Sequence, residues 1–124
     1  MKTEVMLFVN DVQKSSLWYQ NLLGAKSGHG GPEYEMILDQ EDELLFQLHK
    51  LEGDEHGINL SDSSISKGMG VLIYVQVQDI QAVFEQAKSM KADIKSEPTF
   101  IDLARHTECI VKDLDGYSLA LYSR

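Results

Sequence analysis

The sequence predicts an α+β fold of two βαβββ modules, whose strands form a curled eight-stranded mixed sheet around a cleft with the helices on its outer face. A strand followed by an aspartate and a helix occurs at residues 4–23 and again at 71–90, and the equivalent Val9 and Val77 lie 68 positions apart. Three short strands are expected after each helix, so the order βαβββ is used twice. Such a repeat indicates an internally duplicated domain.

The first module begins with the apolar strand 4–9. Asp11 is placed to act as the N-cap of the helix that follows, because its carboxylate can accept hydrogen bonds from exposed backbone amides. The helix should end at about Leu23, since Gly24 suits the left-handed position that terminates helices. Trp18 and Tyr19 lie in this helix, where they could stack on a ligand, although at least one of them is expected in the core. The later strands are expected at 25–27, 33–38 and 43–50.

The second module repeats this order from strand 70–77, with Asp79 as the helix N-cap. Gly116 supplies a positive φ in the tight turn before the last strand. The remaining strands are expected at 92–96, 107–112 and 117–123. The chain is therefore interpreted as one domain, 1–124, with module 1 at about 1–50, a linker or loop at about 51–67, and module 2 at about 68–124.

Composition limits the classes of function. The 124 residues are 43% hydrophobic and 25% charged, which is typical of one globular domain. The net charge of −9 argues against a nucleic-acid partner, because phosphate binding needs an excess of Lys and Arg. No apolar run approaches the roughly 20 residues of a membrane span. The N-terminus lacks the features of a signal peptide, and Cys109 is the single cysteine, so a cytoplasmic location is expected.

Two motifs resemble a known family. Residues 9–24, V-N-D-V-x-x-S-x-x-W-Y-x-x-L-L-G, are similar to the opening of the vicinal-oxygen-chelate superfamily, which includes glyoxalase I, bleomycin resistance proteins and extradiol dioxygenases. Residues 111–119, V-K-D-L-D-G-Y-S-L, resemble its closing motif, with Leu114 where proline is usual. The resemblance covers essentially the whole chain and implies the fold. It says little about function, because this fold hosts unrelated chemistries.

The resemblance also implies where a metal would be held. In enzymes of this family four side chains from four strands bind a divalent cation, and the equivalent positions here are Glu4, Gln47, Leu72 and Ala120. Leucine and alanine have no lone pair to give, and one carboxylate with one amide would bind a metal weakly. We therefore expect no metal and no other cofactor. Family members commonly pair as dimers, so a homodimer is expected.

Strand alternation predicts which side chains face the cleft, because residues two apart share one face of a sheet. The rows that mix polar and aromatic residues should line the cleft, and the purely apolar rows should pack under the helices. The apolar rows are Val5, Leu7 and Val9; Leu44, Phe46 and Leu48; and Val71, Ile73, Val75 and Val77. The mixed rows are Glu4, Met6 and Phe8; Leu45, Gln47 and His49; Leu72, Tyr74 and Gln76; and Ser118, Ala120 and Tyr122. The predicted ligand-binding residues are Glu4, Met6, Phe8, Gln47, His49, Leu72, Tyr74, Ala120 and Tyr122.

Several side chains admit two interpretations. His49 is either a displaced ligand or general base, or a half-exposed residue at a strand end. Arg105, beside His106, either grips a carboxylate bidentately or is a solvated loop charge. Cys109 is expected to be a small buried hydrophobe rather than a nucleophile.

Three functional hypotheses follow. The first is a metal-independent protein, similar to the bleomycin resistance branch, that sequesters a small molecule in the cleft. The alternative is a metal-dependent lyase, isomerase or dioxygenase with rearranged ligands, such as Glu4, Gln47, His49 and one more. A third is a protein–protein module that keeps only a vestigial cleft. No catalytic residue is assigned.

Overall fold

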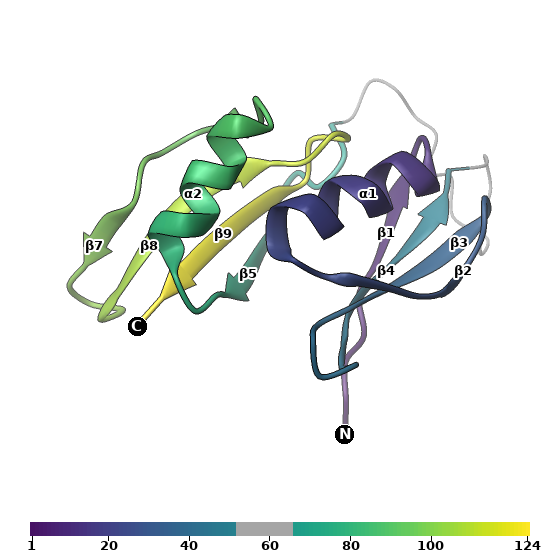
Figure 1. Cartoon of the computed structure of the whole chain (residues 1–124), viewed down its shortest axis with the longest axis horizontal. Helices are drawn as coiled ribbons and strands as arrows, with labels where there is room; N and C mark the ends of the chain where they lie inside the picture. The colour runs from purple at the N-terminus through teal and green to yellow at the C-terminus, as the bar shows by residue number, and fades with distance from the viewer. Residues whose placement is uncertain (52–65) are drawn as a thin grey trace. The chain divides into compact units, whose positions relative to one another are not determined.

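The computed structural model describes residues 1–51 and 66–124, in which there are two helices and nine strands (Figure 1). The chain divides into two compact units, Met1–Ile65 and Ser66–Arg124. Most of the predicted linker, residues 52–65, lies outside the described residues. Neither described helix is long and apolar enough to cross a membrane.

The first unit is a four-stranded mixed sheet covered on one face by a helix. Its strand order is β1-β4-β3-β2, in which β1 and β4 are parallel and the other pairs are antiparallel. The helix α1 packs against β3 and β4. The elements are β1 (Met6–Val9), α1 (Val12–Leu23), β2 (Lys26–Gly30), β3 (Tyr34–Leu38) and β4 (Leu44–Lys50).

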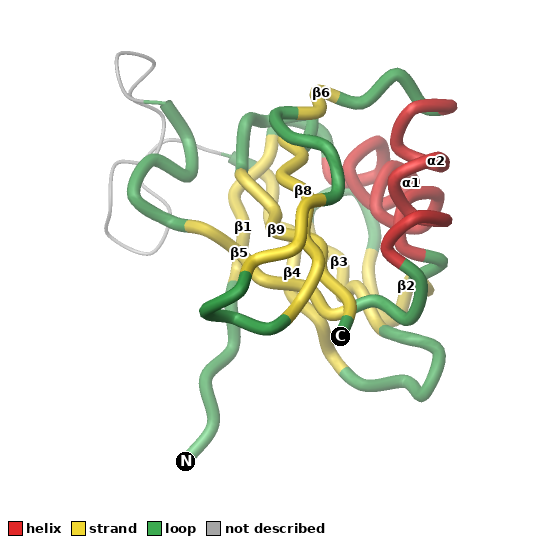
Figure 2. Tube along the Cα trace, turned by 90° about the vertical axis from the view of Figure 1, so that its left-hand side faces the viewer, coloured by secondary structure: helices red, strands yellow, loops and turns green. Residues whose placement is uncertain are grey.

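The second unit is a five-stranded mixed sheet with its own helix. The strand order is β5-β9-β8-β6, and β7 also pairs with β8. The helix α2 packs mainly against β8 and β9. Only short strands interrupt the loop between α2 and β8 (Figure 2). The elements are β5 (Leu72–Gln76), α2 (Ile80–Ser89), β6 (Asp93–Ile94), β7 (Thr99–Ile101), β8 (His106–Lys112) and β9 (Ser118–Ser123).

The two helices begin in the same way, as the internal repeat predicts. The Asp11 carboxylate accepts a hydrogen bond from Lys14 N at 3.0 Å, and Asp79 accepts from Ala82 N at 3.1 Å. Both aspartates are in extended backbone, which is the N-cap conformation. The helix ends differ, since α1 ends at Gly24 with φ 65° whereas α2 ends at Met90 in right-handed backbone.

The predicted alternation of faces is confirmed within β1 and for Phe46 and Leu48 of β4, whereas Val5, which precedes β1, is 41% exposed. Leu7, Val9, Phe46 and Leu48 are buried on the helix side. Tyr19 of α1 is fully buried against this row, with its ring edge-on to Phe46 at 4.6 Å between centroids. Trp18 is buried as well, so both helix aromatics belong to the core.

The apolar row of β5 is less covered than the sequence predicts. Ile73, Val75 and Val77 are only half-buried, and Val71 is 54% exposed. The prediction that this row packs beneath a helix is wrong for Val71. The reason is that β5 is the edge strand, while α2 lies mainly over β8 and β9.

Three further details differ from the sequence prediction. The predicted α+β fold with a strand–helix–strands order in each half is confirmed, but the described residues form two mixed sheets with nine strands instead of one sheet with eight. The ninth strand is the short segment Thr99–Ile101, which forms β7 against β8. Strand β1 begins at Met6 instead of Glu4, since the hydrogen bond from Gln47 N to Val5 O is the first one tying it to β4. His106, expected in the preceding loop, is the first residue of β8.

Candidate ligand-binding surfaces

The face of the first sheet away from α1 carries several predicted site residues. The strand register pairs Gln47 with Met6 on one side and with Met36 on the other. It likewise pairs His49 with Phe8 and with Tyr34. All of these side chains are half-buried, so they form a continuous mixed surface.

Two polar groups on this surface are held by neighbours. The Tyr34 hydroxyl donates a short hydrogen bond to Gln47 Oε1. The Phe8 and His49 rings lie 5.1 Å apart between centroids. His49 Nδ1 lies 2.8 Å from the Lys50 carbonyl, which only accepts, so this nitrogen carries the proton. The amide of Gln47 and the ring of His49 are therefore fixed in orientation.

Glu4 does not join this surface as a strand residue. It precedes β1, is exposed, and forms an ion pair with Lys2 at 3.4 Å. The Glu4 carboxylate is thus paired with a neighbouring surface cation. An ion pair as exposed as this one adds little to the stability of the fold.

The equivalent face of the second sheet carries the other predicted residues. The register pairs Leu72 with Ser118, Tyr74 with Ala120, and Gln76 with Tyr122. Leu72 and Tyr74 are 45% and 53% exposed, whereas Ala120 is fully buried. Leu72 and Ala120 therefore lie on neighbouring strands of one face, opposite the face that carries buried Leu119 and Leu121.

Two residues that the sequence analysis did not place in the site join this face from β8. Glu108 pairs with Tyr122, and His106 lies two residues earlier on the same side of the strand. His106 Nε2 lies 2.6 Å from Glu108 Oε1, and the Tyr74 hydroxyl lies 3.5 Å from the same oxygen. We name this group, together with Gln76 and Tyr122, the aromatic–carboxylate cluster.

Rings and hydrogen bonds hold the aromatic–carboxylate cluster together. The His106 and Tyr122 rings lie 4.6 Å apart at 34°, and Tyr74 meets Tyr122 edge-on at 5.8 Å. The Tyr122 hydroxyl donates to Gln76 Oε1 at 3.3 Å. The Arg124 guanidinium lies 5.2 Å from the centroid of the Tyr122 ring. The cluster thus presents aromatic rings around one carboxylate.

Burial sets the roles of His106 and Glu108. His106 is 6% exposed, and the side chain of Glu108 is 15% exposed. Because a carboxylate oxygen only accepts, the proton of their hydrogen bond is on Nε2 of His106. Nδ1 of His106 is buried without a hydrogen-bond partner among the described residues. The buried histidine therefore holds the Glu108 carboxylate in place by its hydrogen bond, while Tyr74 and one side of the carboxylate remain accessible.

The spacing of His106 and Glu108 was the available signal for this cluster. Two residues at i and i+2 in a strand share a face. Their meeting with Tyr74 and Tyr122 depends on the pairing of β8 with β9 and of β9 with β5, which is not readable from a local pattern. Arg105, by contrast, is exposed in the turn before β8, where its amide donates to Ile101 O at 2.8 Å.

The residues present do not fit the four-ligand metal site that the family resemblance implies. Leu72 and Ala120 have no donor atom, and Glu4 is paired with Lys2. Within residues 1–51 and 66–124, no three or more His, Cys, Asp or Glu side chains come together in a group that could hold a metal ion. We derive no metal-dependent step for this chain.

Cys109 is placed as the sequence predicts. It is fully buried on the helix side of β8. Burial, and secondly the charge of Glu108, raises the pKa of the Cys109 thiol from 9.0 to about 11. The thiol therefore stays protonated at neutral pH and is a poor nucleophile.

Comparison with known proteins gives a match to one family. The model of the Glyoxalase/Bleomycin resistance protein/Dioxygenase superfamily matches residues 3–121. No curated protein matches the chain.

Solved structures with the same fold include a glyoxalase/bleomycin resistance protein/dioxygenase family enzyme from Burkholderia phytofirmans PsJN, at 16% identity, TM-score 0.78, and coverage of 97% of this chain and 95% of that one. The fosfomycin resistance protein FosX from Listeria monocytogenes has 15% identity, TM-score 0.70, and coverage of 100% and 93%. TioX from Micromonospora sp. ML1 has 16% identity, TM-score 0.72, and coverage of 100% and 96%. At these identities the similarity establishes the fold alone.

Proposed function

The chain belongs to the glyoxalase/bleomycin resistance protein/dioxygenase superfamily, whose model matches residues 3–121, and from that premise we propose that it binds a small molecule without a metal and without transforming it. The observation that carries this proposal is the aromatic–carboxylate cluster. It lies on the face where two metal-ligand positions of the family are replaced by Leu72 and Ala120. The face thus offers recognition groups in place of a metal centre.

The chemistry of the cluster indicates the kind of ligand. Glu108 supplies a negative charge in a setting that is only 15% exposed, where a charge-assisted hydrogen bond is stronger than in water. The faces of Tyr74 and Tyr122 attract both flat apolar groups and cations. The net charge of −9 favours the approach of a cation. We infer that the ligand combines a positive charge with an aromatic or other apolar portion.

Sequestration is the role that fits such a ligand. One similar structure is described as a fosfomycin resistance protein, and the family name includes bleomycin resistance. Binding a toxic compound without chemistry would need only the recognition groups described above. We therefore propose a resistance-like binding role, in the cytoplasm, with a small molecule rather than nucleic acid or membrane as partner.

We further propose that the protein is a homodimer. Strand β5 is an edge strand that carries exposed Leu72 and Tyr74 and is preceded by exposed Val71. Unpaired sheet edges with apolar side chains favour association with a second chain. Sedimentation equilibrium should give twice the 14.0 kDa mass of the chain. A monomer at micromolar concentration would contradict this part of the proposal.

Isothermal titration calorimetry tests the binding function. The protein is first treated with a chelator and then titrated with cationic glycopeptides and with aromatic amphiphiles. We expect at least one compound to bind and to be recovered unchanged by mass spectrometry. Failure of the whole panel, a strict requirement for added metal, or conversion of the bound compound would overturn the proposal.

Two variants connect binding to the cluster. Glu108→Gln should lower the affinity for a cationic ligand about tenfold or more, because a hydrogen bond to a charged group contributes about 1.5–3 kcal/mol. Tyr74→Ala should weaken the aromatic ligands. Glu85→Gln is a matched control, since Glu85 is an exposed carboxylate on α2. Equal affinities for Glu108→Gln and Glu85→Gln would show that the cluster is not the binding site.

A further inference from the structure

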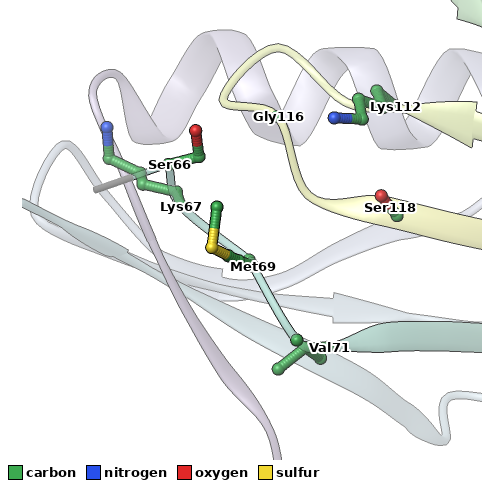
Figure 3. A pocket seen from close by; sticks show the side chains of 9 residues that line it. Ser66, Lys67, Met69, Val71, Lys112, Gly116 and Ser118 are labelled. Atoms are coloured by element: carbon green, nitrogen blue, oxygen red, sulfur yellow. The ribbon is translucent and has the colours of Figure 1, made fainter. Parts of the chain in front are cut away.

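A pocket of about 230 Å³ lies at the other end of the second sheet from the aromatic–carboxylate cluster. One wall is the segment that leads into β5, with Ser66, Lys67 and Gly68. The other wall is formed where β8 ends and β9 begins, with Lys112, Gly116 and Ser118. Lys112 extends toward the Ser66 side of the pocket, whereas the side chain of Lys67 points away from Lys112 and carries its ammonium beyond Ser66 (Figure 3).

Tight packing between the two walls fixes this pocket. A Cβ atom on Gly68 would lie 2.6 Å from Tyr117 Cδ1 and 3.1 Å from Tyr117 Cα, and Gly68 has φ +75°. The segment is therefore in close contact with the β8–β9 turn, and only glycine fits there. Hydrogen bonds from Met69 N to Ser66 O and from Val71 N to Gly68 O fold the segment back on itself. The pocket is thus part of the framework of the unit.

The charges of this pocket are opposite to those of the rest of the chain. The protein has a net charge of −9, and Lys2, Lys26, Lys50, Lys88 and Lys95 each pair with a carboxylate within 4 Å. Within residues 1–51 and 66–124 no such ion pair is formed by Lys67 or Lys112. Asp113, the next residue after Lys112, accepts from the amides of Asp115 and Tyr117 with Oδ1.

We propose that this pocket is a binding site for a small oxyanion, either a phosphate-like group or a carboxylate. Lys112 would provide the charge that contacts the anion, and the ammonium of Lys67, beyond Ser66, would add to the positive potential near the pocket. The hydroxyls of Ser66 and Ser118 are hydrogen-bond donors to an anion oxygen. One ammonium group, that of Lys112, and two hydroxyls around 230 Å³ suit a group of a few heavy atoms.

This site is separate from the aromatic–carboxylate cluster and goes beyond the proposed function. Lys112 and Glu108 are four residues apart on β8, which corresponds to roughly 13 Å along the strand. Ser118 pairs with Leu72, so the pocket lies beside one of the former metal-ligand positions. The same face of the sheet therefore has a basic end and an acidic end, each with its own chemistry.

An NMR titration of the full chain tests the proposal, with inorganic phosphate and with acetate in separate experiments at constant ionic strength maintained with chloride. We expect saturable shifts of the amide signals of Gly68, Gly70 and Gly116 with at least one of the two anions. Saturation by phosphate identifies a phosphate-like ligand, and saturation by acetate alone identifies a carboxylate. If neither anion gives saturable shifts, the proposal is wrong.

Variants separate the pocket from general surface charge. Lys112→Met and Lys67→Met each remove an ammonium while keeping an unbranched side chain, and we expect the double variant to bind at least about tenfold more weakly. Lys14→Met is the matched control, because it removes an exposed lysine of α1. Circular dichroism checks that all variants are folded. Equal anion affinities for the double variant and for Lys14→Met would show that the pocket is not the anion site. This outcome does not depend on whether the aromatic–carboxylate cluster binds its own ligand.

Discussion

Glu108 Oε1 lies 2.6 Å from Nε2 of His106, so a carboxylate and an imidazole two residues apart on one strand form a nearly buried pair. The same oxygen is approached by the Tyr74 hydroxyl from β5, which lies two strands away across β9. One acceptor thus links the inner strand of the second sheet to its edge. The pair has consequences for both stability and binding.

The stability consequence is seen by comparing Glu108→Ala with Glu108→Gln. Alanine leaves the buried Nε2–H of His106 without its acceptor, which should cost about 1–3 kcal/mol of unfolding free energy. Glutamine retains an oxygen at the same place and should cost less. Urea denaturation followed by circular dichroism measures both values. Equal losses for the two variants would mean that the pair contributes packing alone.

Removal of metals should leave the protein unchanged. Leu72 and Ala120 offer no ligand, so we expect the same thermal unfolding midpoint with EDTA and with added zinc, nickel or manganese. Differential scanning calorimetry measures the midpoint, and metal analysis of protein purified without chelator gives the occupancy. A stoichiometric metal, or a midpoint raised by several degrees, would favour a rearranged site that includes Gln47 and His49.

The sequence predicted those parts of the fold that depend on local patterns. The N-caps at Asp11 and Asp79, the end of α1 at Gly24 and the alternating rows of β1 and β4 each follow from a few neighbouring residues. The βαβββ order and the family followed from the repeat and the two end motifs. The caps and the alternating rows are short-range signals that the structure bears out, and the repeated order holds except for the additional strand β7.

The errors concern partners that are distant in sequence. Strand β7 has only three residues, and it is a strand because β8 lies beside it. Val71 belongs to an apolar row, yet its exposure is decided by the position of α2 over β8 and β9. The meeting of Glu108 with Tyr74 likewise depends on the order of the strands, which no single segment encodes.

The two N-caps provide a test of the internal repeat. Asp11→Ala and Asp79→Ala each remove one carboxylate that accepts from a first-turn amide, so each should cost about 1 kcal/mol. Urea denaturation of the single variants measures these costs. Gln13→Ala is the control in the first turn of α1 and should change stability by less than about 0.5 kcal/mol. A loss of stability in only one of the two variants would mean that the equivalent N-caps do not contribute equally to the two units.

Truncation of Tyr19 should have the largest effect on the first unit. Tyr19 is fully buried and contacts the rings of Trp18 at 4.9 Å and Phe46 at 4.6 Å. Tyr19→Ala should cost about 3–5 kcal/mol, as is usual for large aromatic side chains in a core. Leu17→Ala is the control on the same helix, because Leu17 is 59% exposed. Similar losses for both variants in a denaturant titration would contradict the assigned core.

The pH dependence of stability should contain a contribution from Cys109 in the alkaline range. Burial, followed by the charge of Glu108, raises the pKa of the thiol to about 11 from its ordinary 9.0. Since the folded state holds this proton more tightly than the unfolded state, the contribution is complete below pH 9. It is lost as the pH rises from about 9 to about 11. A shift of this size corresponds to about 2–3 kcal/mol.

This contribution is isolated by comparing the protein with Cys109→Ala in urea titrations from pH 8 to pH 11. Tyrosines and lysines also titrate in this range, but they are the same in both proteins, so the difference reports the thiol. We expect the stability gap between the two proteins to narrow as the pH rises. Glu108→Gln should lower the pKa of the thiol, because it removes the second cause of the shift. A gap that stays constant to pH 11 would mean that the thiol ionises as easily in the folded chain as in the unfolded one.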